Sequence, residues 1–353
     1  MKAMVLAAGY GTRFRPITES LPKPLIPLCN RPLIGWVVDT LVAAGVTQIV
    51  VNLHHLPDTL RAWLDGEFGN RLQLVYSYEP RILGTGGGLR RAREHFAGED
   101  VFLLVNGDTI QWPPYAELTE ALRAEGAIAA MMLRHPPEDD RFTSVWFDGR
   151  GVTAIGDRGV GEALMFSGVH ALSPRVFDLL PDREFSGITD DFYVPVLREG
   201  TSAVAGTIHD GLWFDVGSPA RYLAASRELT AALVAGGIAI PRGSHARPDI
   251  ASIVADDARI WGQVSSSVIG ANAIVEARAD VSDSALWDDV RVHGDCRVRS
   301  SIVTSGVALP PGSIVSNAMI CRVGARVVAV TVNPLKSMTV KGVGARDDES
   351  QRP

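Results

Sequence analysis

The stretch "AMVLAAGYGTRFRPITESLPKP", residues 3–24, decides the predicted fold. It begins with a continuous apolar run at 3–8, which is typical of a strand buried on both faces of a parallel sheet. Gly9 and Gly11 follow directly. A glycine-rich turn that leads from a strand into a helix presents backbone N–H groups to a phosphate. The stretch therefore predicts a phosphate-binding loop at the carboxyl end of a first strand.

Neither standard phosphate motif fits this loop. A dinucleotide-binding fingerprint needs a third glycine where Phe14 stands, and the Gly-Lys-Ser/Thr of a Walker loop does not occur in the stretch. The loop carries Arg13 instead, whose guanidinium can bind phosphate oxygens in a bidentate manner, and Lys23, which lies between two prolines. Two cations on a glycine loop favour a nucleoside triphosphate as the ligand.

The alternation of strand and helix patterns continues outward from this loop. Three further apolar runs without polar alternation predict buried strands, at 48–53, 72–78 and 101–108. Helical patterns separate the strands, at 33–41, 59–68, 87–96 and 114–125. This succession indicates a doubly wound, mostly parallel α/β sheet, whose ligands lie beyond the carboxyl ends of the strands.

The sequence changes character after residue 236. Short apolar residues alternate with small and polar ones, and five of them share a six-residue phase: Val268, Ile274, Leu286, Val292 and Val298. Asp280 breaks the phase, and we expect Val281 to take the inward place. A short fixed period with small turn residues predicts a solenoid with three strands per coil. An irregular β-domain is the alternative.

These patterns divide the chain into four segments. We expect a catalytic α/β domain at 1–235, a Gly/Pro-rich linker at 236–251, a β-helix at 252–332 and a polar tail at 333–353.

The composition limits the class of protein. The chain has 353 residues, of which 46% are hydrophobic and 21% charged, as in ordinary soluble globular proteins. A net charge of −6 gives no basic field for nucleic acid. No segment approaches the roughly 20 apolar residues of a membrane span. The three cysteines lack disulfide or metal-ligand spacing, so we expect a cytoplasmic protein.

The opening stretch also carries a family resemblance. Gly11 to Arg13, Pro16 to Thr18 and Pro22 to Pro24 resemble the signature of the sugar-1-phosphate nucleotidyltransferases, or nucleotide-sugar pyrophosphorylases. The resemblance implies a Rossmann-like nucleotidyltransferase fold and the transfer of a nucleotidyl group from an NTP to a sugar-1-phosphate, with Mg²⁺ as cofactor and an NDP-sugar and pyrophosphate as products. The repeats after residue 252 are similar to the left-handed parallel β-helix that several guanylyl and adenylyl members carry.

The resemblance also assigns roles to residues. It implies that Arg13 binds the leaving pyrophosphate and that Lys23 stabilises the α-phosphoryl group. Asp108, in "LLVNGD", and Asp215, in "WFDVGSPARYLAAS", would be the metal ligands. The implied nucleotide-binding residues are Leu6, Ala7, Ala8, Gly9, Gly11, Thr12, Arg13, Glu79, Gly84, Thr85, Gly86 and Asn106.

The sugar site departs from the family pattern. The resemblance implies that Gly107 and Gly168 lie against the sugar, the second of them in "FSGVHAL". The family places a Glu-Lys-Pro before this strand, and its lysine contacts the sugar phosphate. Here the region reads "AIGDRGVGEALMFSG", and Arg158 is the only cation nearby. Either Arg158 substitutes for the lysine, or the sugar phosphate is held by other groups.

Several functions remain open at the level of sequence. GTP with mannose-1-phosphate, or a related hexose- or heptose-1-phosphate, is expected first, because Glu79, Pro80 and "LGTGGGL" resemble the guanylyl branch. A UTP-dependent N-acetylmuramate-1-phosphate uridylyltransferase is the second candidate, and a catalytically silent sensor of nucleotide sugars is the third. The β-helix could also be an acyltransferase that uses His293, although we expect it to assemble a homodimer or higher oligomer.

Overall fold

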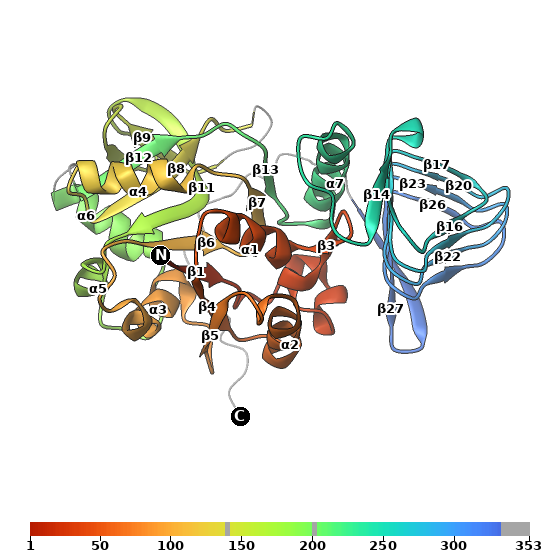
Figure 1. The fold of residues 1–353 in the computed structure, drawn as a ribbon, viewed down its shortest axis with the longest axis horizontal. Helices are drawn as coiled ribbons and strands as arrows, with labels where there is room; N and C mark the ends of the chain where they lie inside the picture. The colour runs from red at the N-terminus through yellow and green to blue at the C-terminus, as the bar shows by residue number, and fades with distance from the viewer. Residues whose placement is uncertain (138–141, 200–202, 333–353) are drawn as a thin grey trace.

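The computed structural model describes residues 1–137, 142–199 and 203–332, so the expected tail at 333–353 lies outside the described residues. An α/β part and a β-helix lie side by side, with helix α7 (Pro219–Val234) between them (Figure 1). None of the helices in these ranges is long and apolar enough to cross a membrane.

The α/β part is built on one nine-stranded sheet. Strand β1 (Lys2–Leu6) lies between β4 (Gln48–Leu53) and β6 (Phe102–Asn106), and β5 (Gln73–Tyr78) follows β4 at the edge. These four strands are parallel, as predicted. Beyond β6 the antiparallel strand β11 (Glu162–Leu172) begins the other half of the sheet. That half also contains β8 (Ala129–Arg134), β9 (Ser144–Phe147), β10 (Val152–Ile155) and β12 (Val204–Ile208).

Helices cover both faces of the sheet, which confirms the doubly wound architecture. One face packs against α1 (Leu33–Ala43), α2 (Pro57–Phe68) and α4 (Tyr115–Ala124). The other packs against α3 (Gly84–Arg91), η4 (Arg93–Phe96), α5 (Val176–Leu179) and α6 (Val194–Glu199). The helix predicted at 87–96 is therefore divided into α3 and η4. The carboxyl ends of the parallel strands stay open for a site.

Three parallel sheets form the β-helix. The sheet that faces α7 contains β14 (Ser244–Arg247), β15 (Ser252–Ala255), β18 (Val268–Ile269), β21 (Ala285–Leu286), β24 (Ile302–Val303), β27 (Ala318–Val323) and β28 (Arg326–Thr331). The second contains β16 (Arg259–Ile260), β19 (Ile274–Val275), β22 (Arg291–Val292) and β25 (Ala308–Leu309). The third contains β17 (Gln263–Ser265), β20 (Asp280–Ser282), β23 (Arg297–Arg299) and β26 (Ile314–Ser316). Only β14 and β28 pair antiparallel with their neighbours.

The inward positions of the β-helix correct the predicted phase. The interior residues follow at intervals of six, six and five residues: Ile269, Val275, Val281, Leu286, Val292, Val298, Val303, Leu309 and Val315. A coil therefore contains 17 residues, so a strict six-residue phase slips by one position in every coil. Val281 is inward as expected, but Val268 packs outward in the cluster that contains α7, and Ile274 is outward beside Val275.

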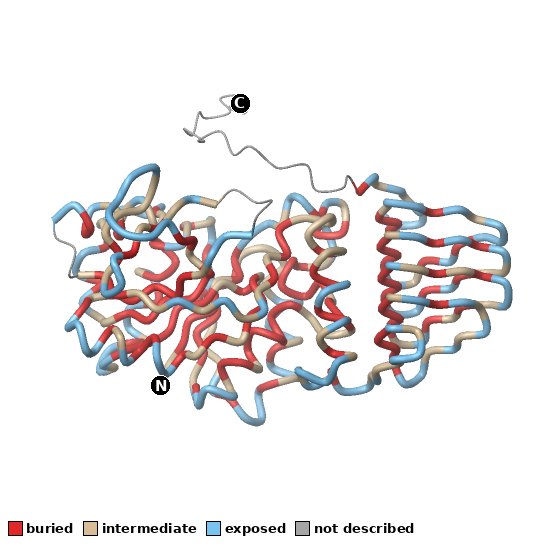
Figure 2. Tube along the Cα trace, turned by 90° about the horizontal axis from the view of Figure 1, so that it is seen from above, coloured by how far each residue is buried: buried red, intermediate tan, exposed pale blue. Residues whose placement is uncertain are grey.

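A buried serine marks each coil on the side of α7. Ser267, Ser284 and Ser301 follow Ser252, and all four are nearly inaccessible. The Ser284 hydroxyl donates to the carbonyl of Ser282 at 2.7 Å and accepts the N–H of Ser301 at 3.1 Å. The other serines repeat this pattern, so a ladder of hydroxyl groups joins the coils. Buried residues fill this side of the β-helix (Figure 2).

The two parts share one hydrophobic cluster, which runs from Phe14 beside the first loop to Ile302 in the β-helix. Tyr222 of α7 lies at its centre and is almost fully buried. Its hydroxyl donates to the carbonyl of Pro27 at 2.7 Å and accepts from Trp287 Nε1 at 3.0 Å. One hydroxyl therefore connects the β-helix, α7 and the segment that follows Lys23.

Candidate active site

A short antiparallel pair of strands brings the two predicted metal ligands together. Strand β7 (Thr109–Gln111) follows Asp108, and it pairs with β13 (Trp213–Asp215) so that Asp215 lies opposite Thr109. The N–H of Val216 donates to the carbonyl of Asp108 at 3.3 Å. Residues more than 100 positions apart in the sequence thus place two carboxylates at one site.

Cations surround the two carboxylates. Lys23 Nζ is 2.5 Å from Asp108 Oδ2, and Arg221 forms an ion pair with Asp215. Burial raises the pKa of Asp215 above its ordinary value, and the negative charge of Asp108 raises it further. The charges of Arg221, Lys23 and Arg13 lower the same pKa. Asp108, Arg221, Lys23 and Arg13 therefore all lie within electrostatic reach of Asp215.

The first glycine loop holds Lys23 close. Gly11 has φ +62°, and a Cβ there would lie 2.8 Å from Lys23 Cβ. Only glycine fits this left-handed position without strain. A Cβ on Gly9 would meet nothing within 4 Å, so Gly9 leaves open space. Thr12 and Arg13 follow in η1 (Thr12–Phe14), and both are exposed.

A buried polar network fixes the start of this loop. The N–H of Ala7 donates to Asn52 Oδ1 at 2.6 Å, and Asn52 Nδ2 donates to Glu79 Oε1 at 2.8 Å. Glu79 Oε2 accepts the N–H of Leu83 at 3.0 Å. Glu79 is fully buried, and both of its oxygens are engaged by the protein. In the structure Glu79 therefore connects the first loop to the second.

The second glycine loop packs against another segment of the chain. The N–H groups of Gly86 and Gly87 donate to the carbonyl of Ser186 at 2.9 and 3.2 Å. Gly84 has φ +74°, and a Cβ there would lie 2.4 Å from that carbonyl oxygen. Close packing thus explains these glycines. Thr85 is exposed, and its Oγ1 accepts the N–H of Ile188 at 2.9 Å.

A cavity of about 320 Å³ lies between the two loops, within the range of small-molecule sites. Most predicted nucleotide-binding residues line it together with Lys23 and Asp108. The lining residues are Leu6, Ala7, Ala8, Gly9, Lys23, Pro24, Asn52, Glu79, Ile82, Gly84, Thr85, Asn106, Gly107 and Asp108.

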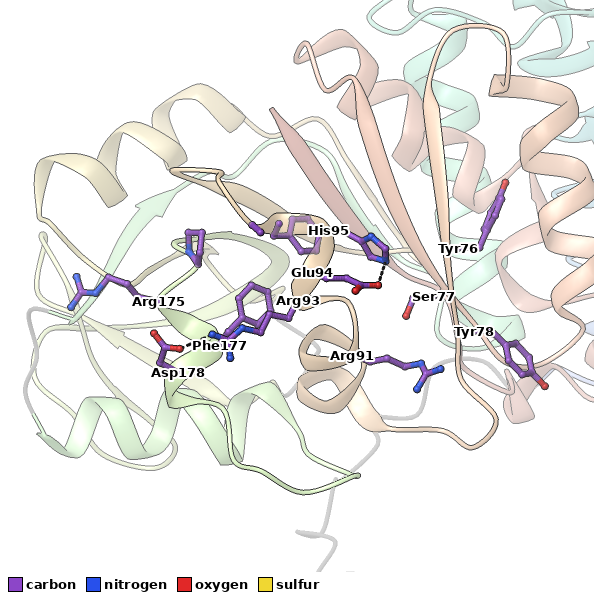
Figure 3. Close-up of a pocket in the computed structure, with 13 residues that line it drawn as sticks. Tyr76, Ser77, Tyr78, Arg91, Arg93, Glu94, His95, Arg175, Phe177 and Asp178 are labelled. Atoms are coloured by element: carbon purple, nitrogen blue, oxygen red, sulfur yellow. Dashed lines mark hydrogen bonds and ion pairs between the residues drawn. The ribbon is translucent and has the colours of Figure 1, made fainter.

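A larger cavity of about 820 Å³ lies elsewhere, between β5, η4 and α5. Figure 3 shows Arg93 pointing toward Asp178, and their Nη2 and Oδ1 atoms are 3.0 Å apart. Glu94 Oε1 lies 3.8 Å from His95 Nε2. Both acidic groups of this cavity thus have basic neighbours, and none of its 13 lining residues is a glycine. The smaller cavity is the better candidate for phosphate chemistry.

The three residues that were predicted to contact the sugar-1-phosphate do not all lie together in the structure. Gly107 donates its N–H to the carbonyl of Leu6 at 2.9 Å, and a Cβ there would lie 2.7 Å from that oxygen. Gly168 has φ +101° at an irregularity in β11, and a Cβ there would lie 3.1 Å from Asn106 Nδ2. Arg158 is exposed between β10 and β11 and does not line the 320 Å³ cavity.

The donor set at the two carboxylates fits Mg²⁺. This hard cation takes oxygen ligands and is commonly held by one or two carboxylates together with substrate phosphates. Asp108 and Asp215 supply such a pair, and the side chain of Asp108 is 39% exposed. Among the described residues no three His, Cys, Asp or Glu side chains gather as a metal site. The phosphate oxygens of a substrate would complete the coordination.

Comparison with protein families decides the assignment of the chain. Residues 2–232 match the family model described as nucleotidyl transferase. The chain belongs to the nucleotidyl transferase family. Residues 234–319 match the model described as GlmU-like, C-terminal hexapeptide. The matched ranges agree with the α/β part and the β-helix of the structure.

Individual relatives extend the comparison. The chain is 34% identical over 233 residues to mannose-1-phosphate guanyltransferase of Candida albicans, and the match covers 63% of either chain. It is 28% identical over 364 residues to probable mannose-1-phosphate guanylyltransferase 2 of Oryza sativa subsp. japonica, which covers 90% of this chain and 98% of the relative. The chain thus spans 63% of the length of the first relative.

A solved structure supports the fold. HddC from Yersinia pseudotuberculosis, crystallised in complex with GMP-PN, is similar with a TM-score of 0.55 and 22% identity. The likeness covers 65% of this chain and 99% of HddC.

Two groups of the candidate site, Arg221 and Asn52, were not expected from the sequence. Arg221 lies six residues after Asp215, and Ser218 and Pro219 before it are typical of a helix start, which places Arg221 in the first turn. Asn52 is a polar residue at the end of an apolar strand. A buried amide at the carboxyl end of a parallel strand is a recognisable signal for a site.

Proposed function

We propose that the chain transfers a nucleotidyl group from an NTP to a sugar-1-phosphate and releases pyrophosphate. The observation that supports this most is the meeting of Lys23–Asp108 and Arg221–Asp215 ion pairs at the open end of the glycine loop. An oxygen of the sugar phosphate attacks the α-phosphorus. The bond from the α-phosphorus to the α,β-bridging oxygen breaks, and pyrophosphate leaves with the electron pair.

The residues of the site have separate roles in this proposal. Asp108 and Asp215 hold Mg²⁺, which when bound supplies positive charge to the phosphate oxygens. Lys23 stabilises charge on the α-phosphoryl oxygens, and Arg13 binds the departing pyrophosphate. Both reactants are anions, so positioning and neutralisation of charge account for most of the catalysis.

The first substrate pair in this proposal is GTP with mannose-1-phosphate, which the names of the relatives support. Release of pyrophosphate from four or five NTPs, each offered with a panel of sugar-1-phosphates that includes N-acetylmuramate-1-phosphate, tests this function. We expect release with one matched pair only, and only with Mg²⁺. Release with no pair would contradict the proposal and favour a regulatory protein.

We also propose a homo-oligomer formed through the β-helix in the cytoplasm. Trp261 and Ile314 are 63% and 75% exposed on the β-helix, and the thiols of Cys29, Cys296 and Cys321 are free and buried. Light scattering after size-exclusion chromatography tests the assembly, and a monomer at micromolar concentration would contradict it. His293 lies 3.1 Å from Glu276, which favours a surface ion pair over acyl transfer.

A further inference from the structure

One hydrophobic cluster contains close sequence neighbours of every proposed catalytic group. Arg13, Lys23, Asp108 and Asp215 each lie within three residues of a buried member of this cluster, and these members are, in the same order, Phe14, Ile26, Ile110 and Val216. The β-helix contributes to the same cluster through Ile253, Val268, Ala285, Trp287 and Ile302. The candidate site is therefore built on a core that the two parts of the chain share.

The hydroxyl of Tyr222 joins two segments of the site inside this cluster. It donates to the carbonyl of Pro27 at 2.7 Å, and Pro27 lies four residues after Lys23. Tyr222 itself lies seven residues after Asp215, in the first turn of α7, where its N–H donates to the carbonyl of Ser218 at 2.8 Å. One hydrogen bond therefore connects the segment that carries Lys23 to the segment that carries Asp215.

The segment between Lys23 and Pro27 is stiff. Three of the six residues at 22–27 are prolines, whose rings fix the backbone angle φ. Lys23 begins the short helix η3 (Lys23–Leu25), and its carbonyl accepts the N–H of Ile26 at 3.0 Å. Because the backbone has little freedom here, a displacement of Pro27 also displaces the ammonium group of Lys23.

The two carboxylates are held at the other end of the same connection. Asp215 ends β13, and Val216 after it is fully buried in the cluster that contains Tyr222. The N–H of Val216 donates to the carbonyl of Asp108 at 3.3 Å, and β13 pairs with β7, so the two carboxylates move together. The hydrogen bond from Tyr222 therefore sets the place of the ammonium group relative to both carboxylates.

The β-helix fixes the hydroxyl of Tyr222. Trp287, which follows β21, donates from Nε1 to this hydroxyl at 3.0 Å, and both side chains are almost fully buried. A buried hydroxyl that accepts from one group and donates to another has a defined orientation. Asn30 adds a second connection, because its Nδ2 donates to the carbonyl of Ile269 in the β-helix at 2.9 Å. The loop that follows Lys23 is therefore attached to the β-helix at two points.

We propose that Tyr222 and Trp287 are positioning residues for the nucleotidyl transfer, and that the β-helix thereby sets the geometry of the catalytic groups. The inference rests on the proposed function and goes beyond it, because it gives the β-helix a part in catalysis. Charge in the transition state is stabilised only by groups that are held in the correct place, so a displacement of Lys23 lowers kcat. Neither Tyr222 nor Trp287 lines the cavity between the two glycine loops, so substrate binding should change little.

Steady-state kinetics of Tyr222→Phe and Trp287→Phe, well below the thermal midpoint, test the inference. We expect Tyr222→Phe to lower kcat about 10- to 100-fold, because a small misplacement of a catalytic group is costly. Trp287→Phe keeps the hydrogen bond to Pro27 and should lower kcat about 3- to 10-fold. The KM for each substrate should stay within about threefold in both variants. Trp261→Phe, at an exposed tryptophan of the same β-helix, is the matched control and should keep the kcat of the wild type.

Ser284→Ala separates positioning from stability, because it weakens the ladder of serine hydroxyl groups and leaves the side chains of Tyr222 and Trp287 in place. Circular dichroism at the assay temperature shows which variants are folded, and Trp287→Phe alone decides if Tyr222→Phe does not fold. In an active wild type, an unchanged kcat in either folded variant, or an equal loss of kcat in Ser284→Ala, would overturn the inference alone. A wild type without turnover on any substrate pair would overturn the proposed function, and the inference with it.

Discussion

The β-helix and the candidate site use buried polar groups in opposite ways. In the β-helix, Ser267 and Ser284 are almost inaccessible, and their hydroxyl groups both donate and accept within the chain. At the site, Lys23 and Asp108 pair with each other, but the side chain of Asp108 remains 39% exposed. A buried polar group whose hydrogen bonds are all made within the chain stabilises the fold. A paired group that faces a cavity can exchange its partner for a ligand.

The largest expected effect is at the Lys23–Asp108 pair. Asp108→Asn should reduce turnover by at least about 10³-fold, because the neutral amide removes a charge that the transition state needs. The thermal midpoint should fall modestly, because Asp108 is 39% exposed whereas the Lys23 side chain is only 10% exposed and loses its charged partner. Asp100→Asn, at an exposed carboxylate paired with Arg123, is the matched control and should keep full activity. Turnover of Asp108→Asn near that of the wild type with excess Mg²⁺ would remove Asp108 from the chemistry.

Two glycines of one loop should separate stability from binding. Gly11→Ala should destabilise the catalytic part by about 1–3 kcal/mol, because its φ is +62° and a Cβ would meet Lys23 Cβ at 2.8 Å. Gly9→Ala has open space and should leave unfolding unchanged while it raises the KM for the NTP. Denaturant unfolding and steady-state kinetics check both variants. Equal stability of the two would refute the conformational account of Gly11.

A substitution in the serine ladder should lower stability and leave activity unchanged. Ser284→Ala leaves the N–H of Ser301 without its partner, so we expect a loss of about 1–3 kcal/mol in the β-helix and unchanged kinetics. Ser265→Ala, at an exposed serine of the neighbouring sheet, is the control. Denaturant unfolding of the wild type and both variants, followed by circular dichroism, measures the change. A loss of activity in proportion to the loss of β-helix stability would contradict this, because it would show that the site depends on the stability of the β-helix.

The smallest expected effect concerns pH. His170 in β11 is buried, with Nδ1 2.7 Å from Tyr193 Oη, and burial lowers its pKa from 6.5 to about 3. Between these values the unfolded chain binds a proton that the folded chain refuses, so the free energy of unfolding falls as pH falls below 6.5. The expected slope is about 1.4 kcal/mol per pH unit. His170→Gln should flatten it, and an equal slope in both proteins at pH 4.5–6.5 would contradict this.

Local patterns predicted the elements better than the contacts between them. The first loop follows from Gly9, Gly11 and the apolar run before them, so its prediction needed only neighbouring residues. The pairing of β7 with β13 joins residues over 100 positions apart, so the sequence indicated Asp108 and Asp215 through the family resemblance only. The role of Glu79 in the network with Asn52 depends on three strands and was not predictable.

The coil length of the β-helix was harder to predict from the sequence for a different reason. Each short strand places only one residue in the interior of the coil, and neighbouring positions such as Val268 and Ile269 are both buried, one outside against α7 and one inside. An apolar pattern cannot distinguish these two faces. The 17-residue spacing of Ser267, Ser284 and Ser301 is the signal in the sequence that gives the coil length.

Phosphorus nuclear magnetic resonance of one reaction tests the central claim most directly. The wild type, GTP, mannose-1-phosphate and Mg²⁺ should give the coupled signals of a nucleoside diphosphate sugar together with an equal amount of pyrophosphate, and Asp108→Asn should leave the substrates unchanged. Orthophosphate in place of pyrophosphate would indicate hydrolysis of the triphosphate. That result, or unchanged substrates with every NTP and sugar-1-phosphate of the panel, would contradict the account.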